Sequence, residues 1–377
     1  MASVDPRAIL AGRSRGRPSV GAILTIAVSS ACLLVALGII ASEGPTFVVG
    51  LMLALLPLPL LLAGVLALDR LEPEPPDALV LAFLWGAGVA VLIAMAINTL
   101  GLTLVWVPLL GEDGGLYATA TLVAPVVEET LKGAVLFGLL WFRRQELNGP
   151  TDGIIYAAMV GLGFATVENI SYYTATAETG TLAATFVLRG LITPLLHPLC
   201  TALTGIGVAT AALRPPGRGR VRPVVAGLLG AIALHALWNG ATAFGLAGTA
   251  FAYVIGFIVL VSLLEVVRRD RKRIVGLIEQ HLPQYLPSGV VTPADLAMLS
   301  TLRGRHQARV WARNTGGRGA ARAMADYQQA ATELAMLHRR YERGLVDRPA
   351  FEQRRQPLVL LMHLAQQVFL GGRSVGR

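Results

Sequence analysis

The sequence has little charge, almost no lysine and only two cysteines. Charged residues make up 15% of the 377 positions and hydrophobic residues 54%, with a mean hydropathy of +0.61. For the chain as a whole this composition is too apolar for a soluble protein, and it is typical of a membrane protein with several spans. Cys32 and Cys200 both lie in apolar runs, so a disulfide framework is excluded. The HExxH signature of helical zinc proteases is absent.

Long apolar runs define the fold class. Eight of them can cross a bilayer, at about 20–42, 46–68, 78–108, 116–142, 151–174, 182–212, 223–246 and 249–267. We therefore predict an all-α, polytopic bundle of about eight transmembrane helices. The first run follows an arginine-rich head, but it is long and a second span follows closely, so we interpret it as a retained helix rather than a secretory signal.

The arginines predict the orientation. Every second connection carries basic residues: Arg7, Arg13, Arg15 and Arg17; Arg70; Arg143 and Arg144; Arg214, Arg218, Arg220 and Arg222; Arg268, Arg269, Arg271, Lys272 and Arg273. The four opposite connections, near 42–46, 111–115, 174–181 and 246–249, carry none. The positive-inside rule then places both termini in the cytoplasm of a plasma-membrane protein. The same asymmetry explains much of the net charge of +9 without a nucleic-acid partner.

The last hundred residues are more polar and predict a small helical region. We expect a basic cytoplasmic N-terminus over 1–19, a transmembrane domain over 20–270 and a cytoplasmic helical tail over 271–377. Because the tail shows no ligand cluster, we interpret it as a packing or partner-binding appendage.

Two helices of the tail can be predicted in more detail. One should cover Pro293–Arg303, with Thr292 as its N-cap. An amphipathic helix should cover Ala320–Arg343 and stop at Gly344. His338 and its arginine neighbours should form a solvated face.

Candidate chemistry begins with Glu128, Glu129 and Lys132 in the fourth span. Such groups cost roughly 2.5–3.5 kcal/mol each in hydrocarbon even on the lenient insertion scale, so they should face a polar interior. Lys132 is one of only two lysines in the chain. We expect one glutamate to pair with Lys132 and the other to face a water molecule.

Polar residues recur on the next three spans. They are Glu168, Asn169 and Tyr172 on the fifth, a stripe of Arg189, Thr193, His197, Thr201 and Thr204 on the sixth, and His235, Trp238 and Asn239 on the seventh. Singly, Arg189, Trp238 and Asn239 have ordinary structural explanations. Three glutamates and two histidines together are too costly for packing, so the set predicts a site.

Two hydrolytic chemistries suit these residue types. A glutamate can take a proton from water while histidine or asparagine stabilises the oxyanion. Alternatively, Glu168, His197 and His235 hold Zn²⁺ and a second glutamate takes the proton. Intramembrane glutamates and histidines also build proton-coupled transporters, and an inactive membrane scaffold is a further alternative.

The ordered motifs resemble those of the PrsW-type intramembrane proteases, relatives of the prenyl-protein endopeptidase and bacteriocin-processing superfamily. They are Glu128-Glu129-x-x-Lys132, Phe164-x-x-x-Glu168-Asn169, His197 and His235-x-x-Trp238-Asn239. The Asp69–Pro75 loop and the following Ala82–Gly86 segment look similar too. The resemblance covers roughly residues 60–245.

This resemblance implies a multi-pass endopeptidase that cleaves a membrane-anchored protein substrate such as an anti-sigma factor. The residues that fall on the family's motifs are Glu128, Glu129, Lys132, Glu168, Asn169, His197, His235 and Asn239. The family is labelled metalloprotease, whereas related enzymes use a glutamate-activated water, so the cofactor is either zinc or none. The lipid bilayer and a cytoplasmic partner for the tail complete the expected partners.

Overall fold

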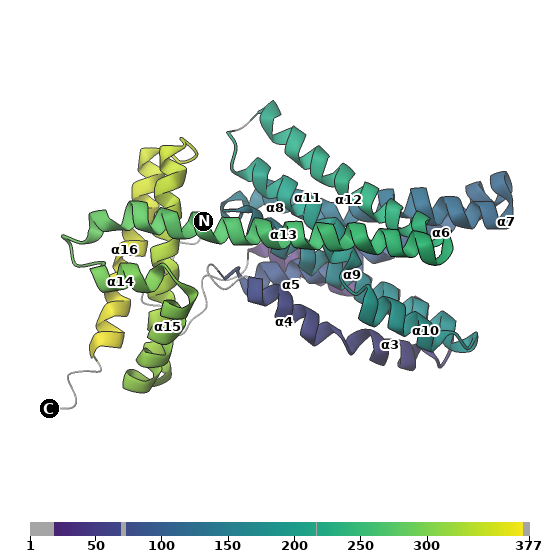
Figure 1. Cartoon of the computed structure of the whole chain (residues 1–377), viewed down its shortest axis with the longest axis horizontal. Coiled ribbons are helices and arrows are strands. Elements are labelled where there is room, and N and C mark those ends of the chain that lie inside the picture. Colours follow the sequence, from purple (N-terminus) through teal and green to yellow (C-terminus); the bar gives the residue numbers. More distant parts are fainter. Residues whose placement is uncertain (1–18, 69–72, 216, 372–377) are drawn as a thin grey trace. The chain divides into compact units, whose positions relative to one another are not determined.

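The computed structural model describes residues 19–68, 73–215 and 217–371, and this part of the chain is helical with no strand (Figure 1). The predicted all-α class is therefore confirmed. The described residues form two compact units, one built from 19–68 and 74–267, the other mainly from 268–371. Predictions about the arginines of 1–18 and about residues 69–72 of the cytoplasmic loop lie outside the described residues.

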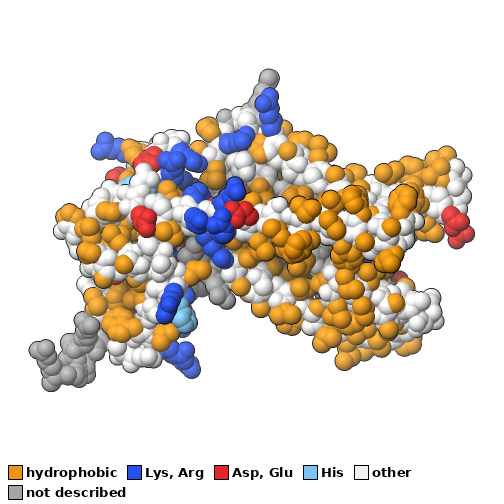
Figure 2. All heavy atoms as spheres, in the orientation of Figure 1, with side chains coloured by type: hydrophobic (Ala, Val, Ile, Leu, Met, Phe, Trp, Pro, Cys, Tyr) orange, Lys and Arg blue, Asp and Glu red, His pale blue; other side chains and the backbone are white. Residues whose placement is uncertain are grey.

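Seven helical stretches of the described chain are long and apolar enough to cross a membrane. They are α2 (Val20–Ala41); α3 with α4 (Phe47–Leu55, Leu58–Leu68); the stretch Pro76–Phe142; α9 (Pro150–Glu178); α10 to α11 (Leu182–Ala212); α12 (Val221–Thr242); and the first part of α13 (Gly245–His281). Their outward side chains are apolar, as the orange surface over α12 and α13 illustrates (Figure 2).

The stretch Pro76–Phe142 contains two predicted spans. It runs through α5 (Pro76–Leu84), η1 (Trp85–Ala90), α6 (Val91–Gly101), η2 (Leu102–Trp106), α7 (Val107–Ala118), η3 (Thr119–Val123) and α8 (Ala124–Phe142). Gly111 interrupts α7 with φ 75° and ψ 177°, a conformation that favours glycine. Helix α6 packs against α8, which shows that the chain turns back on itself between them. The seven stretches thus accommodate the eight predicted spans.

The sixth span is broken beside the candidate site. A short α10 (Leu182–Phe186) and a π-helix η5 (Val187–Ile192) end at Thr193, and α11 (Leu196–Ala212) starts after Leu195. Pro194 lies in this break, and because proline has no backbone N–H it cannot donate the hydrogen bond that would continue a helix. The predicted continuous stripe on this span is therefore wrong at Thr193, whose hydroxyl donates to the carbonyl of Leu188 at 2.9 Å.

Close backbone contacts hold α9 in the centre of the bundle. A Cβ on Gly153 would lie 2.1 Å from the carbonyl oxygen of Gly205, and one on Gly205 would lie 2.0 Å from that of Gly153. Gly163 approaches the carbonyl of Phe83 equally closely. Small residues of this kind allow membrane helices to pack at short range. They fix α9 and α11, which carry part of the site.

The second unit has its own apolar core. It contains the end of α13, η7 (Leu282–Tyr285), α14 (Pro293–Leu299), α15 (Leu302–Glu342) and α16 (Arg348–Gly371). Thr292 caps α14 as predicted, but the helix ends at Leu299 rather than Arg303 because Thr301 caps a new helix. Gly317, with φ 72°, interrupts α15, and Gly344 follows its end with φ 66°.

The predicted solvated face around His338 is wrong. Its ring stacks on His281 at 5.4 Å between centroids, and its Nε2 lies 2.9 Å from the hydroxyl of Tyr285. The side chain is half-buried. Aromatic partners from α13, η7 and α16 account for the difference, and nothing in the helical period of α15 reveals them.

Candidate active site

Helix α8 brings three ionisable side chains together. Glu128, Glu129 and Lys132 are 5%, 0% and 0% exposed, so all three are withdrawn from lipid and water. Lys132 lies one turn after both glutamates, the spacing at which side chains meet on a helix. Its Nζ donates to Glu129 Oε1 at 2.9 Å and to Glu128 Oε2 at 3.4 Å. Lys132 therefore contacts both carboxylates, not only one as predicted.

The two carboxylates differ in how fully they are occupied. Glu129 Oε1 also meets Nδ1 of His235 from α12 at 3.1 Å, and Glu129 Oε2 accepts from the hydroxyl of Thr201 on α11 at 2.9 Å. Among the described residues, the one hydrogen bond to Glu128 Oε1 is a long contact of 3.4 Å with the amide of Asn98 on α6. Glu129 is thus held by three side chains, whereas one oxygen of Glu128 is almost unengaged.

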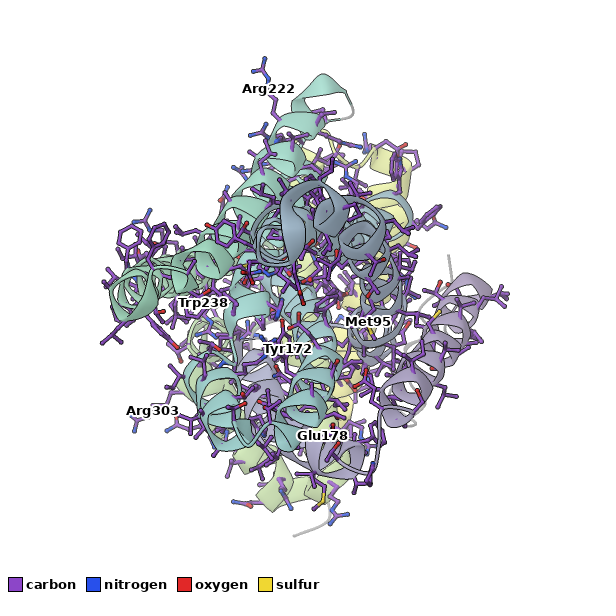
Figure 3. The ribbon with its side chains drawn as sticks, turned by 90° about the vertical axis from the view of Figure 1, so that its right-hand side faces the viewer. Met95, Tyr172, Glu178, Arg222, Trp238 and Arg303 are labelled. Carbon is purple, nitrogen blue, oxygen red and sulfur yellow. The ribbon has the colours of Figure 1, made fainter. Side chains whose placement is uncertain are left out.

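A second group of polar side chains comes from α9 and η5. Glu168 Oε2 lies 2.9 Å from Nε2 of His197 and accepts from the guanidinium of Arg189. Arg189 Nε also donates to Asn169 at 2.7 Å, and its guanidinium carbon lies 3.8 Å from the ring centroid of Tyr172. Tyr172 lies near the middle of the bundle in the view along the spans, whereas Arg222 points away from it (Figure 3).

His197 connects the residues of α8 with this second group. Its Nδ1 lies 2.9 Å from Lys132 Nζ while Nε2 faces Glu168. An ammonium can only donate and a carboxylate only accept, so Nδ1 carries the lone pair and Nε2 the hydrogen. In His235 the hydrogen is on Nδ1, because Glu129 accepts there, and Nε2 lies 3.9 Å from Glu128 Oε2.

The network pairs its buried charges, although its three glutamates outnumber its two cations. Lys132 contacts Glu128 and Glu129, Arg189 contacts Glu168, and Lys132 Nζ also lies 4.0 Å from the ring centroid of Phe164. Removing one member would leave a buried charge unpaired, which is far more costly than the pair itself. The predicted residues of four helices are therefore one connected group.

Some predicted residues lie elsewhere. Asn239 donates to the carbonyl of Ala120 at 2.8 Å and does not join the network. Trp238 packs edge-on against Tyr253. Thr201 contributes directly, although the sequence singled it out only as part of a stripe. Asn98 was missed; a lone amide within an apolar run is the signal that could have found it.

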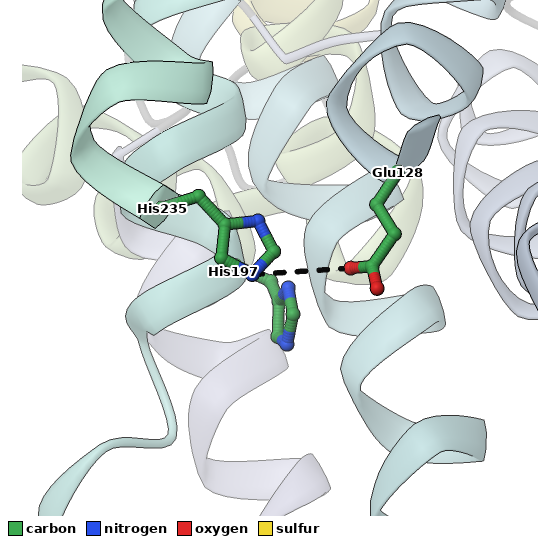
Figure 4. A group of neighbouring side chains, drawn as sticks. All are labelled: Glu128, His197 and His235. Carbon is green, nitrogen blue, oxygen red and sulfur yellow. Dashed lines mark ion pairs between the residues drawn. The ribbon is translucent and has the colours of Figure 1, made fainter. Parts of the chain in front are cut away.

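The donor atoms needed for a metal ion are present. Glu128, His197 and His235 each offer one ligand atom, and these atoms lie within 4.8 Å of one another (Figure 4). Glu168, the carboxylate predicted as a ligand, contacts Arg189 instead. Two imidazoles and a carboxylate are a ligand set that catalytic zinc uses, and Glu129 and Glu168 orient the histidines as carboxylates commonly do at such sites. By residue type the donor set therefore fits a zinc ion. Two of its three members, Glu128 and His197, are also contacted by Lys132 Nζ.

The sequence profile described as PrsW family intramembrane metalloprotease matches residues 74–264, just over half of the chain. The chain belongs to this family. The matched region contains α6, α8, α9, η5, α11 and α12, and hence every side chain of the candidate site described above.

Individual relatives cover less of the chain. It is 31% identical over 137 residues to "Protease PrsW" of Geobacillus kaustophilus (strain HTA426), a match that covers 36% of this chain and 55% of that protein. It is 33% identical over 121 residues to "Protease PrsW" of Clostridioides difficile (strain 630), covering 32% and 49%. The chain thus spans about half the length of these curated relatives. No solved structure matches it.

Proposed function

We propose that this PrsW-family chain is an intramembrane endopeptidase in which Glu128 activates water to hydrolyse a peptide bond of a membrane-anchored protein. The observation that carries the proposal is the difference between the paired glutamates. Three side chains occupy the oxygens of Glu129, whereas in the described part of the chain Glu128 Oε1 has only a 3.4 Å hydrogen bond from Asn98. A general base needs such an unengaged oxygen within reach of the water.

The other residues have supporting roles. Lys132 stabilises the charge of the paired carboxylates, and Glu129 holds both Lys132 and His235. Glu168 is held by Arg189, which also donates to Asn169, and it orients His197. The Nε2 edge of His235 faces Glu128, with Nε2 3.9 Å from Oε2, so this ring lies beside the carboxylate to which we assign the base.

One general base, Glu128, is enough for both proton transfers of the reaction. Glu128 takes a proton from water as the oxygen attacks the carbonyl carbon and the C–O bond forms. The tetrahedral oxyanion collapses, the C–N bond breaks, and Glu128 returns the proton to the leaving nitrogen. Network members buried inside the bundle exclude bulk water and so strengthen these interactions.

The family description raises the alternative of metal-assisted hydrolysis. Glu128, His197 and His235 would hold the ion, which would lower the pKa of a bound water. For that, Lys132 Nζ must leave Nδ1 of His197, which it contacts at 2.9 Å. The contacts of Lys132 are the reason that we favour the glutamate-activated water.

The substrate class follows from the location of the site and from the family resemblance. A site enclosed by membrane-spanning helices meets chains that are themselves anchored in the bilayer. By resemblance, an anti-sigma factor with a single span is the first substrate to test.

The test uses the full chain reconstituted in liposomes with such a substrate. Glu128→Gln should lower kcat by about 10²–10⁴-fold, the contribution of general base catalysis. Glu129→Gln should lose less, about tenfold to a hundredfold, because the amide oxygen still accepts from His235. Glu112→Gln, an exposed glutamate on α7, is the matched control. Cleavage at the parent rate by Glu128→Gln would refute the proposal.

Measuring cleavage with and without a chelator distinguishes the glutamate-activated water from metal-assisted hydrolysis. Full activity in chelator supports the glutamate-activated water. Inhibition that added Zn²⁺ reverses supports the ligand set Glu128, His197 and His235 instead.

A further inference from the structure

Among the described residues, Asn98 is the only one whose side chain hydrogen-bonds to Oε1, the less engaged oxygen of Glu128. It lies on α6, on the face that also carries Val91 and Ala94, both 1% exposed, whereas Ile97 and Leu100 point outward. Its Nδ2 lies 3.4 Å from Glu128 Oε1. The residue therefore belongs to the face that packs on α8, beside the carboxylate to which we assign the chemistry.

The carbonyl oxygen of Asn98 is a buried acceptor without a hydrogen-bond partner in the described part of the chain. An unsatisfied polar group in an apolar interior is costly, so such groups are retained where they meet a ligand or solvent molecule. The amide cannot be turned over to relieve this cost, because Oδ1 would then face the carboxylate of Glu128, which is also an acceptor.

Interhelical packing alone explains this geometry poorly. An asparagine that joins two membrane helices makes short hydrogen bonds, as Asn239 does to Ala120 at 2.8 Å. Asn98 makes one long contact and leaves its acceptor unused. The position next to Glu128 Oε1 is what distinguishes it.

We propose that Asn98 positions the attacking water, which donates one hydrogen to Asn98 Oδ1 and the other to Glu128 Oε1. Water has two hydrogens, so holding both leaves an oxygen lone pair directed at the substrate carbonyl. In the reaction the proton passes to Glu128, the C–O bond forms, and the hydrogen bond to Asn98 keeps the hydroxyl oriented. This inference rests on the proposed function.

The test compares variants of the full chain in liposomes with a substrate that the parent cleaves. Asn98→Leu is close in size and easier to bury in a bilayer, so the fold should persist. We expect kcat to fall about tenfold to a hundredfold with KM unchanged, the value of one hydrogen bond to a reacting group. Thr103→Ala removes a polar side chain that bonds only its own helical segment, and it should keep the parent rate.

A double-mutant cycle tests whether Asn98 acts through Glu128. If both hold the same water, Asn98→Leu should cost little in the Glu128→Gln background, because effects of groups that act together are not additive. Additive losses, a raised KM with unchanged kcat, or an unchanged rate would overturn the assignment. A fully active Glu128→Gln variant would instead refute the proposed function, and these outcomes are distinguishable.

Discussion

At the scale of single residues, the cost of charge in hydrocarbon predicted which side chains gather in the candidate site. Glu128, Glu129, Lys132, Glu168, His197 and His235 all converge, because this cost depends on the residue and its apolar neighbours in sequence. The partner of each oxygen was not predictable. Whether Glu128 or Glu129 is fully bonded depends on Thr201 and His235, which approach from other helices. Asn98 and Asn239 are both single amides in apolar runs, and sequence could not rank them.

His338 gives a prediction about pH. Burial lowers its pKa to about 4, with His281 and Arg355 adding to this effect and Glu342 and Glu352 opposing it. An unfolded histidine titrates near 6.5, so the unfolded state takes up the proton first. The stabilisation is complete above pH 6.5 and decreases as the pH falls toward 4.

We therefore expect amide exchange in α15 and η7, corrected for its intrinsic pH dependence, to be faster at pH 5 than at pH 7. His338→Phe keeps the ring contact with Phe351 and should flatten the difference. His306→Gln changes an exposed histidine of the same helix and should not alter it. Equal protection of the parent at both pH values would contradict the prediction.

At the scale of elements, the apolar runs predicted the spans and missed their interruptions. Hydropathy responds to the average of a window, so it cannot detect the break at 193–195 or the π-helical segments, which change hydrogen bonding but not composition. Pro194 and Pro57 were the available signals for two of the breaks. The continuity of α13 from a span into the second unit was equally hidden, because a helix passes from lipid to water without a change in period.

The contact between α9 and α11 predicts a large effect of small substitutions. Gly205→Val would force a side chain into the backbone of Gly153, whose carbonyl oxygen lies 2.0 Å from the point that a Cβ on residue 205 would occupy. We expect a loss of about 1–3 kcal/mol or more, as for overpacked cores, together with loss of activity as His197 shifts. Gly138→Ala in α8 has open space around it and should be neutral or slightly stabilising. Thermal unfolding in detergent compares the two, and equal midpoints would contradict the packing argument.

At the scale of the whole molecule, charge asymmetry predicts orientation where the structure alone does not. The connections at 143–146 and 213–222 and the segment that begins at Arg268 are rich in arginine, whereas those at 42–46, 111–115 and 174–181 have no basic residue. Basic segments are retained on the cytoplasmic side. The second unit should therefore be cytoplasmic, and the turn at Gly111 should lie on the opposite side.

Cysteine labelling in intact cells tests this orientation. In a background with Cys32 and Cys200 replaced by alanine, Asp113→Cys should react with a membrane-impermeant maleimide, because this exposed residue follows Gly111. Gln307→Cys, exposed on α15, should react only after the cells are opened. The reverse pattern would place the second unit outside and contradict the orientation. It would leave the network around Glu128 intact, since its contacts lie within the bundle and are independent of which side faces the cytoplasm.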